Sequence, residues 1–250
     1  MIKIRNLQKS YGEKTILNNI NLDVAEGETV AIIGPSGSGK STTLRCINLL
    51  EQPDKGELTI GEKTYNFNHL TKHEITEIRR TTAMVFQNFS LYENKTALEN
   101  ITLPLIKAKK YSKKDAIETA VKYLEKVGLK DWKDHYPCQL SGGQQQRVGI
   151  ARALALKPEV ILFDEPTSAL DPERVQGVLE IIKEISEERI TSIIVTHELK
   201  FALDVADKVI FIADGDIVEQ GTAEEVLKNP QDDRTIRFLG HFADKVEYVI

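Results

Sequence analysis

The chain reads Thr29-Val30-Ala31-Ile32-Ile33-Gly34-Pro35-Ser36-Gly37-Ser38-Gly39-Lys40-Ser41 shortly after its start. Residues 34–41 match the pattern G-x-x-x-x-G-K-[ST], in which backbone N–H groups surround bound phosphates. The apolar run before Gly34 predicts a buried parallel strand, and a helix is expected from Lys40 towards Asn48. A strand, a glycine-rich turn and a helix in this order predict an α/β fold with a phosphate site at the helix N-terminus.

The side chains of this loop have separate expected roles. Lys40 brings a positive charge to the β- and γ-phosphates of a nucleotide, and the Ser41 hydroxyl is a ligand for Mg²⁺. The sequence therefore predicts a site for a nucleoside triphosphate together with Mg²⁺. The residues expected to bind this cofactor are Gly34, Pro35, Ser36, Gly37, Ser38, Gly39, Lys40, Ser41 and Thr42.

Two adjacent carboxylates follow a second apolar run, Val160-Ile161-Leu162-Phe163. The run predicts a buried strand, so Asp164 would lie at the carboxyl edge of the sheet, where α/β folds bind their ligands. There Asp164 is expected to orient Mg²⁺, directly or through water. Glu165 follows immediately and is the candidate general base for an attacking water.

The pentapeptide Leu140-Ser141-Gly142-Gly143-Gln144 is a second candidate for anion binding. Ser141 is a predicted helix N-cap, and the glycines expose backbone N–H groups at a helix N-terminus. The segment is remote in sequence from the phosphate loop and has no chemistry of its own. Because chance rarely produces such a run, the two motifs together are more specific than either alone.

Composition excludes several classes of protein. The chain has 250 residues, of which 41% are hydrophobic and 28% charged, with a formal net charge of −5. This is typical of a globular protein, and the negative balance argues against nucleic acid as a partner. Cys46 and Cys138 match no metal-ligand spacing and are expected to be reduced and buried or half-buried. No apolar run approaches the roughly 20 residues that span a bilayer.

Further elements are predicted along the chain. Alternating patterns predict strands at residues 2–7 and 16–24. Further strands are expected at 56–60, at 82–86 as a buried strand, and at 191–195, with a hairpin at 208–220 that turns at Asp214-Gly215. Because the chain starts as a strand, no signal peptide is expected. Capping boxes predict helix starts at Thr71, Thr96 and Thr222. From Thr96 to Ala155 the pattern is almost wholly helical, which predicts a helical subdomain inserted into the α/β core.

In the order of these motifs the chain resembles the ATPase subunits of ABC transporters over essentially its whole length. In that family two chains enclose ATP between them, so the resemblance implies ATP as the nucleotide and a homodimer as the working unit. Ser141, Gly142 and Gly143 would then contact the γ-phosphate of the ATP held by the opposite subunit. Gln144 is expected to bind the cofactor with them.

The resemblance also implies roles for single residues. Gln87 matches the glutamine that senses Mg²⁺ and water and faces the membrane partner. His197 matches the switch histidine that contacts the γ-phosphate, so Glu165, His197 and Gln87 form the expected catalytic set. Tyr11 stands where the family places an aromatic ring against adenine. The segment Ser168-Ala169-Leu170-Asp171 matches the loop that crosses the dimer interface.

The implied fold is a P-loop NTPase (RecA-like) core with a mostly parallel sheet, an antiparallel β subdomain and an inserted helical subdomain. Residues 1–250 are expected to form a single domain of this kind. Residues 1–88 and 157–250 would make the core and the antiparallel β subdomain, and residues 89–156 the helical subdomain.

Three further stretches are similar to importers of polar amino acids, namely Leu44–Glu51, Thr196–Ala202 and Asn229–Thr235 with Phe238-Leu239. The implied function is hydrolysis of ATP to ADP and phosphate, which drives amino-acid uptake through separate integral-membrane permease subunits. The chain would lie as a peripheral subunit on the cytoplasmic face of the cell membrane. An external solute-binding protein would be an indirect partner.

Other functions stay open at this point. A transport-family ATPase with another role, such as lipoprotein release or cell-division signalling, fits the motifs equally well. A soluble ABC ATPase that acts on DNA or ribosomes typically has a long coiled-coil insertion or two cassettes, and this sequence has neither. Leu91-Tyr92-Glu93-Asn94 departs from the stretch usual in polar amino-acid importers, which leaves the details of permease docking open.

Overall fold

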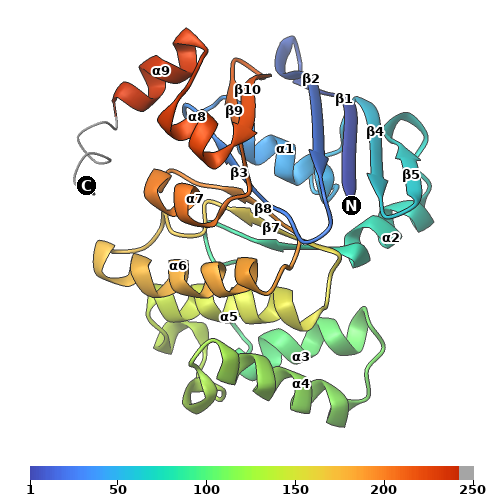
Figure 1. Ribbon diagram of the computed structural model, residues 1–250. Coiled ribbons are helices and arrows are strands. Elements are labelled where there is room, and N and C mark those ends of the chain that lie inside the picture. Colours follow the sequence, from blue (N-terminus) through green and yellow to red (C-terminus); the bar gives the residue numbers. More distant parts are fainter. Residues whose placement is uncertain (242–250) are drawn as a thin grey trace.

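The computed structural model describes residues 1–241, and its strands form two sheets (Figure 1). One sheet has four strands in the order β2-β1-β4-β5, and the other has six in the order β10-β9-β3-β8-β7-β6. The strands are β1 (Ile2–Tyr11), β2 (Lys14–Val24), β3 (Thr29–Ile33), β4 (Lys55–Ile60), β5 (Lys63–Asn66), β6 (Thr82–Val85), β7 (Val160–Asp164), β8 (Ser192–Val195), β9 (Lys208–Ala213) and β10 (Asp216–Thr222).

Helices separate and cover these sheets. They are α1 (Lys40–Ile47), α2 (Lys72–Thr81), α3 (Ala97–Lys107), α4 (Lys113–Lys126), α5 (Gly142–Ala155), α6 (Pro172–Glu187), α7 (Leu199–Val205), α8 (Ala223–Lys228) and α9 (Asp233–Gly240), with 3₁₀ turns at Phe67–His69, Lys130–Trp132 and Pro137–Gln139. Within the described residues, none of the helices has both the length and the apolar character needed to cross a membrane.

The six-stranded sheet is parallel except at one edge. β3 pairs in parallel with β8 and β9, and β7 pairs in parallel with β6 and β8. β10 joins β9 as an antiparallel neighbour through a hairpin. The predicted α/β fold with a mostly parallel sheet is therefore confirmed. The carboxyl ends of β3, β8, β7 and β6 lie along one edge, which is where parallel sheets bind ligands.

Both faces of the parallel sheet are buried, and the residues of β3 alternate between them. Val30 and Ile32 pack in the same core as α1 and the antiparallel sheet, whereas Ala31 and Ile33 pack beside α7 and α8. In this arrangement α1 lies between the two sheets (Figure 1). Burial on both faces explains why β3 is an uninterrupted apolar run in the sequence.

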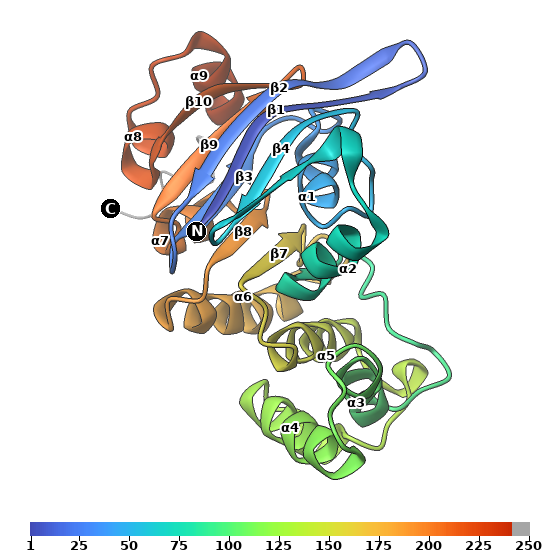
Figure 2. The same cartoon turned by 90° about the vertical axis from the view of Figure 1, so that its right-hand side faces the viewer.

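Helices α3, α4 and α5 lie together at the end of the molecule far from the antiparallel sheet (Figures 1 and 2). Ile101, Leu124 and Val148 on these helices share one core with β6, β7 and α6. The helical block expected between Thr96 and Ala155 is thus present. The exact subdomain boundaries stay a prediction, and residues 242–250 of the predicted domain lie outside the described residues.

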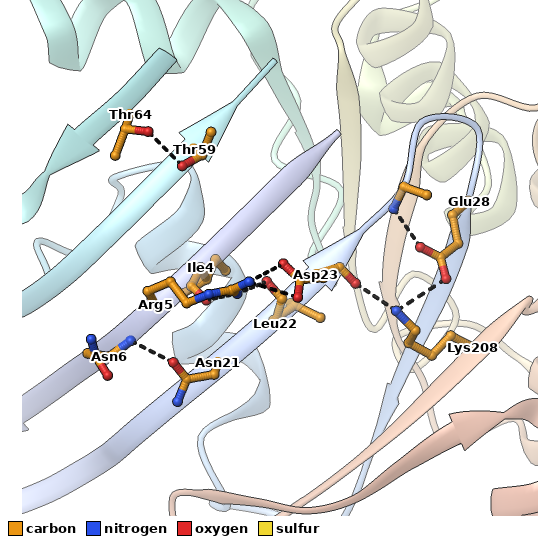
Figure 3. Close-up of polar contacts among 11 residues, drawn as sticks. Ile4, Arg5, Asn6, Asn21, Leu22, Asp23, Glu28, Thr59, Thr64 and Lys208 are labelled. Atoms are coloured by element: carbon orange, nitrogen blue, oxygen red, sulfur yellow. Dashed lines mark hydrogen bonds and ion pairs between the residues drawn. The ribbon is translucent and has the colours of Figure 1, made fainter. Parts of the chain in front are cut away.

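Polar contacts join the antiparallel sheet to β9 of the parallel sheet (Figure 3). Arg5 on β1 donates hydrogen bonds of 2.7 and 2.9 Å to the carboxylate of Asp23 on β2. Lys208 on β9 donates to the Asp23 carbonyl oxygen at 2.8 Å, and its Nζ lies 3.3 Å from the carboxylate of Glu28. Ion pairs near the surface stabilise little, so the apolar core between the sheets supplies most of the stability.

Several local predictions are also confirmed. Capping boxes begin α2 at Thr71, α3 at Thr96 and α8 at Thr222. The predicted hairpin turns at Asp214 and Gly215, whose φ angles of 52° and 82° are those of a type I′ turn. Short-range hydrogen bonds and turn chemistry therefore set these boundaries, as the sequence pattern indicates.

The expectation for the cysteines is correct for only one of them. Cys46 is buried on α1, whereas Cys138 is exposed in the 3₁₀ turn before α5. In that turn Pro137 is the residue that is buried. The prediction that Cys138 is buried or half-buried is wrong, because a tight turn directs adjacent side chains to different sides and only one of them reaches the core.

Candidate functional site

Four neighbouring strands end at one edge of the parallel sheet, and each leads into predicted site residues. The phosphate loop (residues 34–41) follows β3, and His197 follows β8. Asp164 ends β7 with Glu165 directly after it, and Gln87 follows β6. The topology of the sheet thus brings to one edge residues that are widely separated in the sequence.

The phosphate loop has a backbone that requires glycine. Gly34, Gly37 and Gly39 have φ angles of 144°, 77° and 104°. A Cβ atom on Gly34 would lie 2.0 Å from the carbonyl oxygen of Ile212, and one on Gly39 would lie 2.5 Å from Cδ2 of Leu17. The backbone angles disfavour a side chain at all three glycines, and close packing also excludes one at Gly34 and Gly39.

Lys40, the first residue of α1, is folded back onto this loop. Its Nζ donates hydrogen bonds to the carbonyl oxygens of Gly34 at 2.9 Å and Pro35 at 2.8 Å. Burial lowers the pKa of Lys40, while the negative charges of Glu165 and Asp164 act in the opposite direction. A buried ammonium that is bonded to neutral carbonyls gains from a phosphate group, which supplies a full negative charge.

The loop also holds a hydroxyl group, that of Ser38, which makes no hydrogen bond with the described residues. Ser38 is buried, and its Oγ has no hydrogen-bond partner among the described residues. Ser41 and Thr42, in the first turn of α1, are half-buried, whereas Ser36 is exposed. Buried polar atoms are usually hydrogen-bonded, so the Ser38 hydroxyl marks a place for a ligand atom or water.

Asp164 is buried at the end of β7, with 1% of its surface exposed. Its Oδ2 accepts a hydrogen bond of 3.1 Å from Nη2 of Arg45, across 119 residues of sequence. Its Oδ1 is buried and has no partner within residues 1–241. A buried carboxylate oxygen without a partner suits a hard cation such as Mg²⁺ or a water bound to it.

Glu165 has a backbone conformation that is uncommon for a residue with a side chain, with φ of 47°. Its Oε1 lies 3.1 Å from Nε2 of His197, and its Oε2 accepts a hydrogen bond of 3.0 Å from the Ser168 hydroxyl. Strain of this kind, which costs about 1–3 kcal/mol, is common at active sites. The carboxylate is oriented from both sides, as a general base requires.

The start of α5 has the predicted N-cap. The Ser141 hydroxyl accepts a hydrogen bond of 3.3 Å from the Gln144 N–H, and Oε1 of Gln144 accepts one of 2.8 Å from the Ser141 N–H. The two residues therefore form a capping box. The remaining N–H groups of the first turn can bind an anion.

The two glycines after Ser141 let other elements approach this helix end. A Cβ atom on Gly142 would lie 3.3 Å from the side chains of Leu170 and Phe89, and one on Gly143 would lie 3.3 Å from Arg174. The nearest neighbours of these glycines therefore belong to other segments than the phosphate loop. Their expected contact with the ATP of a second subunit stays a prediction.

Gln87 is exposed, and α5 holds the segment around it. Nε2 of Gln146 donates to the Phe86 carbonyl oxygen at 3.2 Å, and Nη1 of Arg152 donates to the Ser90 carbonyl oxygen at 2.9 Å. Sequence reasoning missed Gln146 and Arg152, whose only local signal is a polar residue on an otherwise apolar helix face. These bonds connect the helix that starts at Ser141 to the segment that carries Gln87.

Tyr11 lies at the end of β1 with 47% of its surface exposed. Nζ of Lys9 lies 4.9 Å from the centre of its ring. Partial burial, followed by a hydrogen bond to Glu51 and the charge of that residue, raises the pKa of Tyr11 to about 12. The phenol is therefore neutral at physiological pH, and its exposed ring is available to stack on a base.

A magnesium ion at this edge would need ligands that the protein alone does not supply. In the part of the chain that the structure describes, no group of three or more His, Cys, Asp and Glu side chains could hold a metal ion. Mg²⁺ typically takes one or two carboxylates, several waters and phosphate oxygens. Asp164 and the Ser41 hydroxyl therefore fit a metal that arrives with the nucleotide.

Residues 17–168 match the family model described as ABC transporter. Over 249 residues the chain is 53% identical to the probable amino-acid import ATP-binding protein YxeO of Bacillus subtilis (strain 168), with 100% of both chains covered. It is 51% identical to the L-cystine import ATP-binding protein TcyC of that organism, with 96% of this chain and 97% of TcyC covered. It is 52% identical to the glutamine transport ATP-binding protein GlnQ of the same strain, with 96% and 98% covered.

Solved structures are similar as well. A dimeric post-hydrolysis state of the ATP-binding cassette MJ0796, bound to ADP and Pi, has a TM-score of 0.79 and 40% sequence identity, with 89% of this chain and 99% of that chain covered. A dimeric structure of MJ0796 as a bacterial ABC transporter cassette has the same TM-score of 0.79 and 42% identity. The predicted fold class, an α/β P-loop NTPase, is confirmed by these similarities.

Proposed function

The chain belongs to the ABC transporter family, and we propose on that premise that it is the ATP-binding and ATP-hydrolysing subunit of an amino-acid importer. Its relatives YxeO, TcyC and GlnQ are named for the import or transport of amino acids, L-cystine and glutamine. Similarity to them over 96% or more of the chain supports import of polar amino acids. The single observation that carries the ATPase is the position of the phosphate loop and the Glu165–His197 pair at the ends of neighbouring strands.

In this proposal residues 34–42 bind the phosphates of ATP. The Lys40 ammonium exchanges the Gly34 and Pro35 carbonyl oxygens for β- and γ-phosphate oxygens, which are stronger acceptors. The Ser38 hydroxyl gains the partner that it lacks. Tyr11 stacks on adenine through its exposed ring.

Magnesium enters the proposal with the nucleotide. Asp164, through its unpartnered Oδ1, and the Ser41 hydroxyl would hold it, with Gln87 at the end of the neighbouring strand. When bound, the ion neutralises negative charge that develops on the phosphates. The support for this site is the buried oxygen of Asp164, Oδ1, which has no hydrogen-bond partner among the described residues.

The residues around Glu165 fit the removal of a proton from water. The Ser168 hydroxyl and His197 bind different oxygens of the Glu165 carboxylate, which restricts its rotation. In the proposed reaction Glu165 accepts a proton from water, the water oxygen bonds to the γ-phosphorus, and the bond to the β–γ bridging oxygen breaks so that ADP leaves. His197 would donate a hydrogen bond to the γ-phosphate. This arrangement provides general base catalysis, which contributes about 10²–10⁴-fold to a rate.

A second copy of the chain completes each site in this proposal. The solved MJ0796 cassettes are dimeric, which supports a dimer for this chain too. Residues Ser141–Gln144 of one subunit would bind the γ-phosphate held by the other through the free N–H groups at the start of α5. ATP then joins the subunits, so that binding closes the dimer and hydrolysis reopens it.

Membrane subunits are the remaining partners. An import ATP-binding subunit works on permeases, and we infer that the chain is a peripheral subunit on the cytoplasmic face of the membrane, with a solute-binding protein as an indirect partner. Residues 1–88 and 157–250 would form the core and the antiparallel β subdomain. Residues 89–156 would form the helical subdomain, and Gln87 would face the permease.

Reconstitution tests this function. The chain is purified, combined with amino-acid permease subunits and solute-binding proteins from its source organism, and placed in vesicles that contain ATP and Mg²⁺. We expect uptake of a polar amino acid that depends on ATP and is lost with Glu165→Gln. ATP hydrolysis without uptake of any amino acid would contradict the importer assignment and leave the ATPase assignment in place.

A further inference from the structure

Arg45 on α1 makes an ion pair with Asp164 at the end of β7. Nη2 of Arg45 lies 3.1 Å from Oδ2 of Asp164, and the side chains are 44% and 2% exposed. The contact joins the helix that follows the phosphate loop to the strand end that carries both site carboxylates. The pair is therefore half-open, with a buried carboxylate and a guanidinium that reaches water.

Within residues 1–241, Arg45 is the only residue that donates a hydrogen bond to this carboxylate, although the charge of Lys40 also acts on it. Its second oxygen, Oδ1, is buried without a partner in the described part of the chain. The ammonium of Lys40 is bonded to the carbonyl oxygens of Gly34 and Pro35. Glu165, the next residue, adds a second negative charge close by. Removing a carboxylate from water is unfavourable unless an opposite charge lies near it, and Arg45 supplies that charge.

We propose that Arg45 is the counter-ion of Asp164 in the metal-free state and that it releases this carboxylate when Mg²⁺ binds. The inference rests on the proposed function, because it takes Asp164 as a magnesium ligand. The exchange is feasible because, within residues 1–241, the guanidinium makes a single hydrogen bond, and its side chain is exposed enough to return to water. Arg45 then competes with the metal, and the strength of the pair sets how tightly Mg²⁺ binds.

The first experiment measures the pair without metal. Thermal unfolding is recorded in a chelator for the wild type, Arg45→Met, Asp164→Asn and the double variant. We expect Arg45→Met to lower Tm by about 3–6 °C, because Asp164 then stays buried and uncompensated. In the Asp164→Asn background the same substitution should have little effect, since no charge remains to be balanced. An equal loss of Tm in both backgrounds would overturn the proposal and make Arg45 a packing residue.

Two further variants serve as controls. Arg5→Met removes the exposed pair with Asp23 and should change Tm by less than about 2 °C in either background. Arg45→Lys keeps the positive charge and should restore part of the Tm that Arg45→Met loses. If Arg45→Met does not fold, Arg45→Lys replaces it, and the effect of Arg45→Lys on Tm is measured with Asp164 and with Asn at position 164. A Lys variant as unstable as the Met variant would count against a charge interaction.

The second experiment measures release to the metal. ADP binding is titrated by calorimetry with Mg²⁺ and in a chelator. The ratio of the two affinities in Arg45→Met is compared with that in the wild type. We expect this ratio to rise about fivefold or more in Arg45→Met, because the metal no longer competes with a guanidinium. An unchanged ratio would overturn the proposed release of Asp164 by Arg45 and would leave the proposed function in place. If Asp164→Asn has the same ratio as the wild type, the assignment of Asp164 as a magnesium ligand in the proposed function fails instead.

Discussion

Nε2 of His197 lies 3.1 Å from Oε1 of Glu165, which joins the residues that follow β8 and β7 into one polar unit. The Ser168 hydroxyl binds the other oxygen of the same carboxylate at 3.0 Å. The geometry therefore assigns one oxygen of Glu165 to each neighbour. The orientation of the Glu165 side chain therefore depends on His197, which follows β8, and on Ser168, which follows β7.

Glu165→Gln is expected to retain ATP binding and to lose turnover, because the amide keeps the shape of the side chain but cannot accept a proton. The rate should fall by about 10²–10⁴-fold. Release of phosphate measures the rate, and size exclusion with ATP should show a dimer that accumulates. A Gln variant that hydrolyses ATP as fast as the wild type would show that another group is the base.

Lys40→Ala is expected to weaken ATP binding by about 10- to 100-fold, because hydrogen bonds from the ammonium to the phosphates are lost. Calorimetric titration measures the affinity. Lys72→Ala on α2 is the matched control, since it removes an exposed lysine from the start of a different helix. Equal affinities for the wild type and Lys40→Ala would remove Lys40 from the nucleotide site.

The two thiols are expected to react at very different rates. Burial raises the pKa of Cys46 to about 12 from 9.0, which reduces its thiolate at neutral pH by about 1,000-fold. Since the pKa is raised, the thiol stays protonated up to that pH, and raising the pH from 7 to 9 should not make it reactive. Cys138 is exposed and should react first.

A coloured aromatic disulfide reagent counts these thiols. The native protein should give one fast thiol, the denatured protein two, and Cys138→Ser should have no fast thiol. Rapid reaction of both thiols in the native state would contradict the burial of α1 between the sheets.

Arg152→Met should lower the free energy of unfolding by about 1–2 kcal/mol, because the Ser90 carbonyl oxygen loses its donor and the ring of Tyr92 loses a cation 5.8 Å from its centre. Denaturant unfolding measures the change. Arg80→Met, at an exposed position of α2, is the control. A loss as small as that of the control would mean that Arg152 does not hold the segment after Gln87.

The sequence predicted those parts of the fold that depend on local chemistry. The apolar run before Gly34, the capping boxes and the Asp214-Gly215 turn each contain the residues that determine the structure. The edge on which Asp164 lies could also be predicted, because the carboxyl ends of parallel strands lie at the same edge of the sheet.

Contacts between distant segments could not be predicted in this way. Arg45 and Asp164 are 119 residues apart, and nothing local to either residue indicates the other. The order of strands in the sheet decides that His197 lies beside Glu165, and this order follows from packing of the whole chain. The exposure of Cys138 could not be predicted for the same reason, since it depends on which side of the turn meets the core.

The central claim is that each ATP lies between two subunits, with the phosphate loop from one and Ser141 from the other. It is tested by counting slowly exchanging ATP in dimers joined by a flexible linker, all carrying Glu165→Gln. We expect two ATP per dimer in the parent and none when both halves carry Lys40→Ala or both carry Ser141→Arg, whose bulky cation blocks the helix end. A dimer with Lys40→Ala in one half and Ser141→Arg in the other should hold one ATP, because both defects then fall in the same site. No bound ATP in this mixed dimer, or ATP retained when both halves carry Ser141→Arg, would contradict the shared site.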